Sequence, residues 1–471
     1  MKSNDHRPTF PLTRRDALRA FGGGLGMTAF AAVAGRPATA LAATAGVSEN
    51  PWAPKNPHFP ATAKNVIVIF LAGGLSQIDT FDFKPMLEKY DGKPLPYEMP
   101  RTEFAVGNLM KSPFSWKKYG SNGIDVSQLF PYTGEIIDEF TIVRSMISDI
   151  PNHGPSVLMM TTGSVRAGRP SWGSWVTYGL GTENQNLPGF IALSSGRGGR
   201  GNGSAFLPSV YQGTGVPYGE EDPRKQIQYL ANPRLDLKDQ RTQLDLLRDL
   251  NQMHVEKIGG APELEATIQS MEVAFHMQTE APEVFDIRKE SEATRKMYGD
   301  TGFARGCLLA RRLVEKGVRF VQVDDSGWDH HADINGHIFK SKLVDQPIAA
   351  LVKDLKQRGL LDQTLVLVAS EFGRTPVINL GGFRSVHNGR DHNIFGFTVL
   401  LAGGGVKRGK IYGATDDFGF KVAENPVHVH DLHATMLHTL GLDHERLTYR
   451  YSGRDFRLTD VEGKVVKDIL V

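Results

Sequence analysis

The chain has 471 residues, of which 54 are basic and 52 acidic, so its formal net charge at pH 7 is +2. This near balance gives no support for nucleic-acid binding, which normally shows a strong basic excess on one face. The length suffices for one large domain with insertions or for two domains, and the single cysteine, Cys307, excludes an internal disulfide.

The first 45 residues have the organisation of an export signal. Arg14 and Arg15 precede a glycine-rich, moderately apolar stretch from 21 to 35, and small residues at 38, 40 and 42 then offer cleavage sites. This order resembles a twin-arginine signal peptide. We therefore expect residues 1–45 to be a cleaved signal and the rest to be exported to the periplasm or out of the cell. No later segment approaches the roughly 18 uninterrupted apolar residues of a membrane span, so none is expected.

Beyond the signal, apolar runs alternate with helical patterns. Continuous apolar runs, typical of strands buried on both faces, cover residues 65–71, 319–323, 364–369 and 395–402. Helical patterns lie before the second run, before the third and after the fourth, at 304–316, 346–359 and 431–440. The alternation predicts an α/β fold with a mostly parallel sheet and helices on both faces.

The remaining segments predict one elaborated domain rather than two. Residues 241–297 read as several charged helices inserted into the α/β plan, and the sequence contains no internal repeat. We expect residues 46–471 to form a single domain with a helical insertion at about 220–300. Cys307 lies in a helical apolar pattern, which favours a small buried role.

Polar residues gather where such a sheet would place a binding site. Ligands bind at the carboxyl ends of strands in open α/β sheets. The first run leads to Ser76, Asp79 and Asp82, the second to a stretch rich in aspartate and histidine at 324–331, and the third to residues 370–375. Carboxylates and imidazoles that gather from several strands suit Zn²⁺ or another divalent ion.

Other interpretations of these residues stay open. Asp79 and Asp82 are each compatible with capping a following helix and with taking part in chemistry. Glu371 and Arg374 are also compatible with a simple ion pair at the sheet edge. His433 lies in a helical pattern that looks like core packing, so we expect a structural role for it.

Three blocks of the sequence point to one family. They are Gly-Trp-Asp-His-His around Asp329 and His331, Ser-Glu-Phe-Gly-Arg-Thr from Ser370, and Arg-Asp-His from Arg390. In order and content they resemble the signature blocks of a bacterial family known as domain of unknown function 1501. That family is placed in the alkaline phosphatase and sulfatase superfamily, so the resemblance implies an alkaline phosphatase-like fold but no particular activity.

The resemblance also implies roles for single residues. Glu371 stands at the acidic metal-ligand position of a sulfatase motif, and His392 stands where phosphatases place a late histidine ligand. Asp325 and Asp329 have the spacing of the aspartate and histidine that bind one metal in phosphatases, with a carboxylate at the second position as a departure.

The largest departure from the sulfatases concerns the nucleophile. His153 replaces the sulfatase cysteine in an otherwise matching block that ends at Thr162-Gly163, and Val157 replaces an arginine. The aspartate expected after the first strand falls on residues 72–74, which offer no ligand. Ordinary sulfatase chemistry is therefore not expected.

Two functional classes remain open. The first is a metal-dependent hydrolase of phosphate or sulfate esters, phosphate preferred, acting on a small anionic ester or glycan-derived substrate. Its ion would be Zn²⁺, with Ca²⁺, Mg²⁺ and Mn²⁺ as alternatives, and its predicted ligands are Asp325, Asp329, His331, Glu371, Asp391 and His392. The predicted catalytic residues are His153, as base, ligand or nucleophile, and two oxyanion clamps, Arg374 and Arg390. The second class is a non-catalytic protein that binds an anion or a glycan on the same fold.

Overall fold

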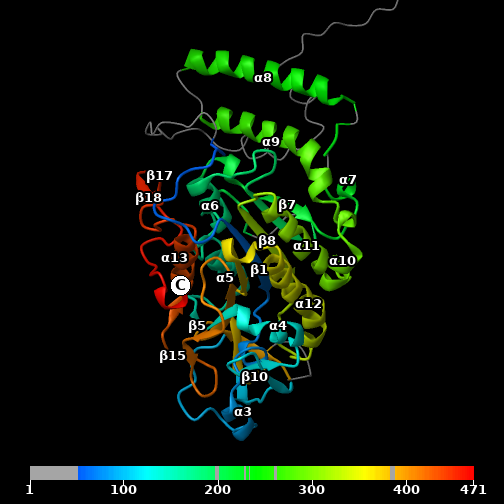
Figure 1. Cartoon of the computed structure of the whole chain (residues 1–471). Helices are drawn as coiled ribbons and strands as arrows, with labels where there is room; N and C mark the ends of the chain where they lie inside the picture. The colour runs from blue at the N-terminus through cyan, green and yellow to red at the C-terminus, as the bar shows by residue number, and fades with distance from the viewer. Residues whose placement is uncertain (1–50, 197–200, 228–229, 233, 259–261, 382–387) are drawn as a thin grey trace, which may run out of the picture.

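The computed structural model describes residues 51–196, 201–227, 230–232, 234–258, 262–381 and 388–471 (Figure 1). The predicted signal peptide, residues 1–45, lies outside the described residues. Among the described residues, no helix combines the length and the apolar character that a membrane crossing needs.

The core is a nine-stranded sheet in the order β13-β5-β12-β9-β1-β8-β6-β7, with β16 paired to β5. Parallel pairs join β1 to β8 and β9, β6 to β7 and β8, and β5 to β13 and β16. The sheet is therefore mixed and mostly parallel, as the sequence predicted. The four predicted apolar runs correspond to β1 (Asn65–Ala72), β8 (Phe320–Ser326), β9 (Thr364–Ala369) and β12 (Phe397–Ala402). The other strands are β5 (Phe140–Ile147), β6 (Phe190–Ser194), β7 (Thr214–Pro217), β13 (Lys410–Tyr412) and β16 (Val427–His428).

One of these strands departs from the parallel pattern. β12 runs antiparallel to both β9 and β5. After β9 the chain stays at the edge where that strand ends and forms a small sheet from β10 (Gly373–Asn379), β11 (Arg390–Asn393) and β2 (Val106–Leu109). Because β12 begins close after β11 at this edge, it enters the main sheet in the reverse direction, as a short connection requires.

Helices flank the sheet (Figure 1). α11 packs against β1, β6 and β8, α12 packs against α11, and α6 packs against β6 and β8. The bounds of these helices and of two others near the site are α5 (His153–Thr162), α6 (Trp172–Leu180), α11 (Gly302–Glu315), α12 (Gly336–Gln357) and α13 (Val429–Thr439). Cys307 in α11 is fully buried, which confirms its predicted packing role.

Helices also occupy the predicted insertion. α8 (Leu237–Ile258) and α9 (Pro262–Val284) lie side by side at one end of the molecule, and α10 (Glu292–Tyr298) follows (Figure 1). α9 packs on α11, which connects the insertion to the helices that cover the sheet. The insertion therefore lies away from the strand ends that carry the candidate site.

Candidate metal centre

The candidate site lies where three adjacent parallel strands end. β1 pairs with β8 on one side and with β9 on the other, so that Leu71 lies opposite Asp325 and Phe70 opposite Ala369. Because parallel neighbours end at the same edge of a sheet, the segments that follow them meet there. Polar side chains from the segments after β8 and β9 are in contact at this edge, as the sequence predicted.

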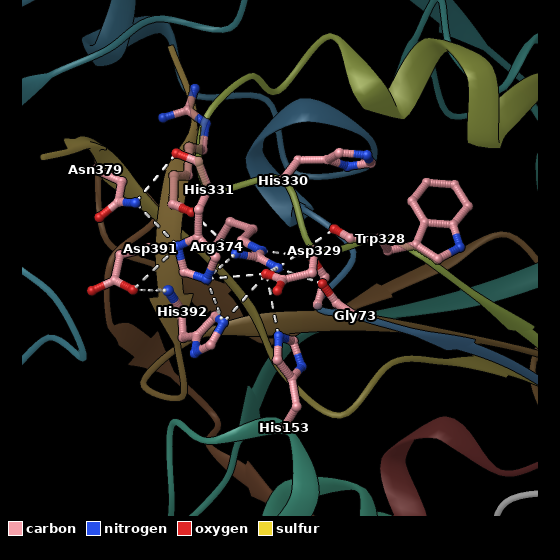
Figure 2. Close-up of polar contacts among 12 residues, drawn as sticks. Gly73, His153, Trp328, Asp329, His330, His331, Arg374, Asn379, Asp391 and His392 are labelled. Atoms are coloured by element: carbon pink, nitrogen blue, oxygen red, sulfur yellow. Dashed lines mark hydrogen bonds and ion pairs between the residues drawn. The ribbon is translucent and has the colours of Figure 1, made fainter. Parts of the chain in front are cut away.

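Three imidazole rings meet at one carboxylate oxygen, Oδ1 of Asp329 (Figure 2). This oxygen lies 3.2 Å from Nε2 of His153, 3.0 Å from Nε2 of His331 and 3.5 Å from Nε2 of His392. His153 is the first residue of α5, Asp329 and His331 follow β8, and His392 lies in β11. The four ligand atoms lie within 4.8 Å of one another. We call these four residues the central group.

In two of the three histidines, Nδ1, the ring nitrogen that points away from Asp329, contacts a hydrogen-bond acceptor. Nδ1 of His153 lies 2.6 Å from Oε1 of Glu371, and Nδ1 of His392 donates to the carbonyl of Pro151. Since a carbonyl only accepts, neutral His392 has its proton on Nδ1 and a lone pair on Nε2. Acceptors at the outer nitrogen are typical of histidines that bind a metal through the other nitrogen.

The third histidine has a different partner. The side-chain amide nitrogen of Asn379 lies 3.2 Å from Nδ1 of His331, and Nε2 of His331 lies 2.8 Å from Nε2 of His392. An amide that donates to Nδ1 leaves the proton of His331 on Nε2, where it bonds to the lone pair of His392. This proton therefore lies between the two rings.

The central group fits a divalent cation. Nε2 of His153 is buried and makes no well-directed hydrogen bond to any residue that the structure describes, although it lies 3.2 Å from Asp329. Imidazole nitrogens with one carboxylate form a donor set that suits Zn²⁺ and other borderline ions. Asp329, His331 and His392 would hold such an ion, and Nε2 of His153 would face it.

Burial and hydrogen bonding give the rings different protonation states. Burial alone would lower the pKa of His153, but the carboxylates of Asp329 and Glu371 beside its two ring nitrogens outweigh burial and raise the pKa to about 9. Burial lowers the pKa of His392 to about 4; the nearby carboxylate of Asp329 opposes this effect, and the charge of Arg374 adds to it. Burial opposes ionisation of Asp329, yet hydrogen bonds from the histidines hold its pKa well below the usual range. At neutral pH the group therefore combines a carboxylate, a protonated His153 and a neutral His392.

The affinity of the central group for a cation is expected to depend on pH, because a cation must displace the proton on His153. This ring is protonated below its pKa of about 9. Displacement of one proton raises the association constant for Zn²⁺ about tenfold per pH unit up to that pKa, with a plateau above it. Titration of Zn²⁺ against a competing chelator between about pH 6 and pH 8.5 measures the slope.

A variant of Glu371, the residue that contacts Nδ1 of His153, provides the control for this pH dependence. Glu371→Gln removes a charge that raises the pKa of His153, so the rise in Zn²⁺ affinity should reach its plateau at lower pH. An affinity that stays constant over the same range in the wild-type protein would contradict proton displacement from His153.

Arg374 brings a positive charge to the central group. Its side chain is fully buried in β10, and Nη2 lies 2.6 Å from Oδ1 of Asp329. Nε donates to the carbonyl of Gly74 at 2.9 Å, and Nη1 donates to that of Arg390 at 3.1 Å. These bonds to the main chain fix the guanidinium plane beside the central group. The alternative of an ion pair with Glu371 is not what the structure shows, because Arg374 pairs with Asp329.

Two residues predicted at the site lie outside the central group. Asp325 forms an ion pair with Lys340 of α12, with an oxygen–nitrogen distance of 2.7 Å, and accepts a hydrogen bond from the indole of Trp328. Arg390 forms a fully buried ion pair with Asp79 at 2.7 Å. The structure therefore does not place Asp325 among the ligand atoms that meet, and it engages the guanidinium of Arg390 in a structural pair.

Two other predicted ligands, Glu371 and Asp391, lie beside the central group, near Nδ1 of His153 and of His331 respectively. Glu371 accepts the main-chain N–H of Gly73 with both oxygens, at 2.9 and 3.1 Å, while it contacts His153. Asp391 accepts the N–H of Phe104 at 2.8 Å, and its Oδ1 lies 3.8 Å from Nδ1 of His331. Both carboxylates therefore orient the segments and rings around the group instead of meeting at its centre.

A close approach of two main-chain segments positions Asp329. Gly73 has φ +122°, and a Cβ atom there would lie 2.6 Å from the amide nitrogen of Trp328 and 2.7 Å from that of Asp329. Only glycine accommodates this conformation and this contact. The position at which the resemblance expects a ligand aspartate is thus filled by the main chain of the neighbouring segment.

Buried contacts decide the remaining alternatives. Asp79 pairs with Arg390, and Asp82 accepts a hydrogen bond from Thr415, so neither side chain is bound at a helix N-terminus or in the central group. His433 is fully buried and hydrogen-bonded to a helix carbonyl, which confirms its predicted structural role.

The sequence alone missed several residues that shape the site. They are Pro151, whose carbonyl holds His392, Asn379, which contacts His331, and Phe104, whose ring centroid lies 5.0 Å from that of His331. A main-chain carbonyl carries no residue-specific pattern, and Asn379 and Phe104 lie in segments without polar clusters.

Solved structures of similar overall fold include sulfatases and alkaline phosphatases, all at low sequence identity to this chain. The PsFucS1 sulfatase from Pseudoalteromonas sp. is 12% identical, with 81% of this chain and 68% of that chain covered and a TM-score of 0.35. A protein in the alkaline phosphatase superfamily from Vibrio parahaemolyticus is 11% identical, with 82% and 68% covered and a TM-score of 0.36. A TAB5 alkaline phosphatase mutant with Mg bound is 12% identical, with 81% and 99% covered and a TM-score of 0.32. Because the sequence identities and TM-scores are low, these structures assign no role to any residue of this chain. The sequence matches no curated protein.

The fold and the site define a class of protein. It is an α/β protein with a mixed, mostly parallel sheet flanked by helices, and a group of histidines and an aspartate that could hold a metal lies at the ends of its strands. Residues 63–470 match the family described as "Protein of unknown function (DUF1501)". The chain belongs to this family, which confirms the resemblance noted in its sequence.

Proposed function

We propose that this protein is an exported, metal-dependent hydrolase of phosphate or sulfate esters, with phosphate esters preferred. The observation that carries the proposal is the convergence of three Nε2 atoms on one oxygen of Asp329, at distances from 3.0 to 3.5 Å. A divalent cation held there would polarise the ester and lower the pKa of bound water.

His153 and Glu371 are proposed to move a proton. The carboxylate of Glu371 is fully buried and binds Nδ1 of His153, so it orients the ring and stabilises its positive charge. Nε2 then points toward Asp329 and is the atom that gives or takes the proton. A side chain that transfers a proton in this way contributes about 10²- to 10⁴-fold to the rate.

Arg374 is proposed to hold the anionic part of the substrate. Its planar guanidinium matches the oxygens of phosphate and sulfate groups. Bonds to the carbonyls of Gly74 and Arg390 fix its orientation. Its contact with Asp329, at 2.6 Å, is the interaction for which an anionic substrate would compete.

Phosphate esters are preferred because of the residue at position 153. In sulfatases, which the surrounding block resembles, a cysteine at this place is converted into an aldehyde hydrate. An imidazole cannot form that group, whereas it can transfer a proton or accept a phosphoryl group. The chemistry of His153 therefore suits phosphoryl transfer better than sulfate ester cleavage.

The proposal is tested by assaying metal-loaded mature protein against aryl phosphates, phosphodiesters and aryl sulfates. We expect turnover that needs the added metal and is fastest with a phosphate ester. The Asp329→Asn variant, purified in parallel, controls for contaminating phosphatases, because it keeps the size of the side chain and removes the shared carboxylate. Equal turnover by this variant would contradict the proposal.

A non-catalytic binding protein is the second candidate. The observation that favours it is the loss of the sulfatase nucleophile, whose position is occupied by His153. For this candidate, the same protein should bind phosphate or a sulfated glycan without turnover, and His153→Ala should leave that binding unchanged.

Export by the twin-arginine route is part of the proposal. It is supported by the arginine pair at 14 and 15 and by the order of basic, apolar and small residues that follows. Replacing both arginines by lysine keeps the charge but removes the address that the pathway reads. We expect full-length precursor to accumulate in the cytoplasm, as measured by cell fractionation. Normal processing of the lysine variant would show that another route is used.

A further inference from the structure

A second cluster of ligand-type side chains lies near the start of α13. It consists of His428, His430 and Glu462, each of which offers one ligand atom within 4.8 Å of the others. None of the three belongs to the central group, and none was predicted as a site from the sequence. We call these residues the second cluster.

Hydrogen bonds fix the ring of His430 with a lone pair that has no partner. Its Nε2 lies 2.9 Å from the carbonyl of Gly163 and must donate, because a carbonyl only accepts. Nδ1 of the neutral ring therefore carries the lone pair. The residue is only 6% exposed, and this nitrogen has no hydrogen-bond partner in the described part of the chain.

The ring of His428 has a partner at both nitrogens. Its Nε2 lies 3.0 Å from the carboxylate of Asp149, and its Nδ1 accepts the N–H of His430 at 3.2 Å. The ring therefore donates to Asp149, and its Nδ1 lone pair accepts the N–H of His430, a bond that a cation at Nδ1 would replace. A carboxylate behind the outer nitrogen is the arrangement that raises the basicity of metal-binding histidines.

The surrounding charges favour a cation at the second cluster. Glu462 and Asp149 contribute two carboxylates, and Gly163 is the C-cap of α5, so the negative end of that helix dipole lies here. The positive end of α13 opposes them, but Asp431 in the first turn of α13 offsets it by accepting the N–H of His428.

We propose that the second cluster is a second divalent-cation site, with two imidazoles and one carboxylate as ligands. This donor set suits Zn²⁺, Co²⁺ or Ni²⁺. Because His430 holds the C-cap of α5 and His153 begins the same helix, the two sites lie at opposite ends of α5. The second site would fix the far end of the helix that carries His153.

The experiment uses mature protein in which Asp329→Asn and His331→Ala have removed the central group. It is loaded with Co²⁺ or Zn²⁺, desalted, and analysed for metal per chain and for the visible Co²⁺ spectrum. One equivalent of metal should remain. Because this background lacks the central group, the result does not depend on whether the protein is a hydrolase.

Variants of the second cluster then decide the assignment. Glu462→Gln changes an exposed residue and is expected to leave the fold intact while it removes the bound equivalent. Asp149→Asn should weaken binding about 10- to 100-fold, as expected for an outer partner of a histidine ligand. Glu445→Gln, an exposed carboxylate outside the cluster, is the matched control. Loss of all metal from the Asp329→Asn/His331→Ala background, or full retention in Glu462→Gln, would overturn the proposal.

Discussion

Replacing Asp329 by alanine is expected to remove the divalent cation that we propose for the central group, so that the metal content falls by one equivalent. Oδ1 of this carboxylate is the common neighbour of all three imidazole Nε2 atoms. Its loss also separates Arg374 from its ionic partner and leaves that buried guanidinium unpaired, a change that typically costs about 3 to 5 kcal/mol. Elemental analysis of purified protein measures the metal, and circular dichroism measures the fold.

A second variant separates loss of the ion from loss of structure. In the double variant His331→Ala/His392→Ala the pair between Asp329 and Arg374 remains, while two proposed nitrogen ligands are gone. This variant should also lose one equivalent of metal. The matched control is Asp325→Asn, which changes a carboxylate of the same segment that is paired with Lys340. Unchanged metal content in the double variant would refute the assignment of the central group.

Chelation provides an independent readout of the same ion. A ligand that binds only the folded state stabilises it by about 2.7 kcal/mol at a free concentration of 100 times its Kd. The melting temperature of the wild-type protein should therefore fall when the metal is removed. The His331→Ala/His392→Ala variant should show a smaller fall.

Replacing His153 by alanine is expected to reduce turnover of the best phosphate ester about 10²- to 10⁴-fold at saturating metal. The reason is the position of the ring, whose Nδ1 is held by Glu371 and whose Nε2 lies 3.2 Å from Asp329. Metal affinity has to be measured beside kcat, because the same Nε2 atom belongs to the central group.

Two further variants sharpen the test of His153. The residue that sulfatases have at this place is restored in His153→Cys, and we expect it to remain as slow as the alanine variant with phosphate esters. His276→Ala, on the surface helix α9, controls for a general effect of removing a histidine. Turnover of His153→Ala within a factor of about two of the wild type would exclude proton transfer by this residue.

Much of the fold was predictable because strands buried on both faces have continuous apolar sequences. β1, β9 and β12 are buried along their length, and β8 is buried up to Asp324, so their sequences are mostly apolar. The direction of β12 was not predictable in this way. It depends on the small sheet of β10 and β11, which returns the chain to the edge where β9 ends.

The edge that carries the site was also predictable, since parallel strands end together. Asp329, His331, Glu371 and His392 each follow or flank a predicted strand, and their type alone suggested a metal. Membership in the family was predictable from the same blocks of sequence.

Only the tertiary structure decided which of these side chains meet. Sequence spacing placed Asp325 and Asp329 on equal terms, but Lys340 from a later helix engages the first and Arg374 the second. Arg390 looked as available as Arg374, yet its buried guanidinium pairs with Asp79, some three hundred residues earlier in the chain. The sequence by itself determined the apolar strands and the supply of ligand-type residues at one edge of the sheet. Partners distant in sequence decided the role of each residue, because a buried charge must find its counter-charge wherever the fold brings one near.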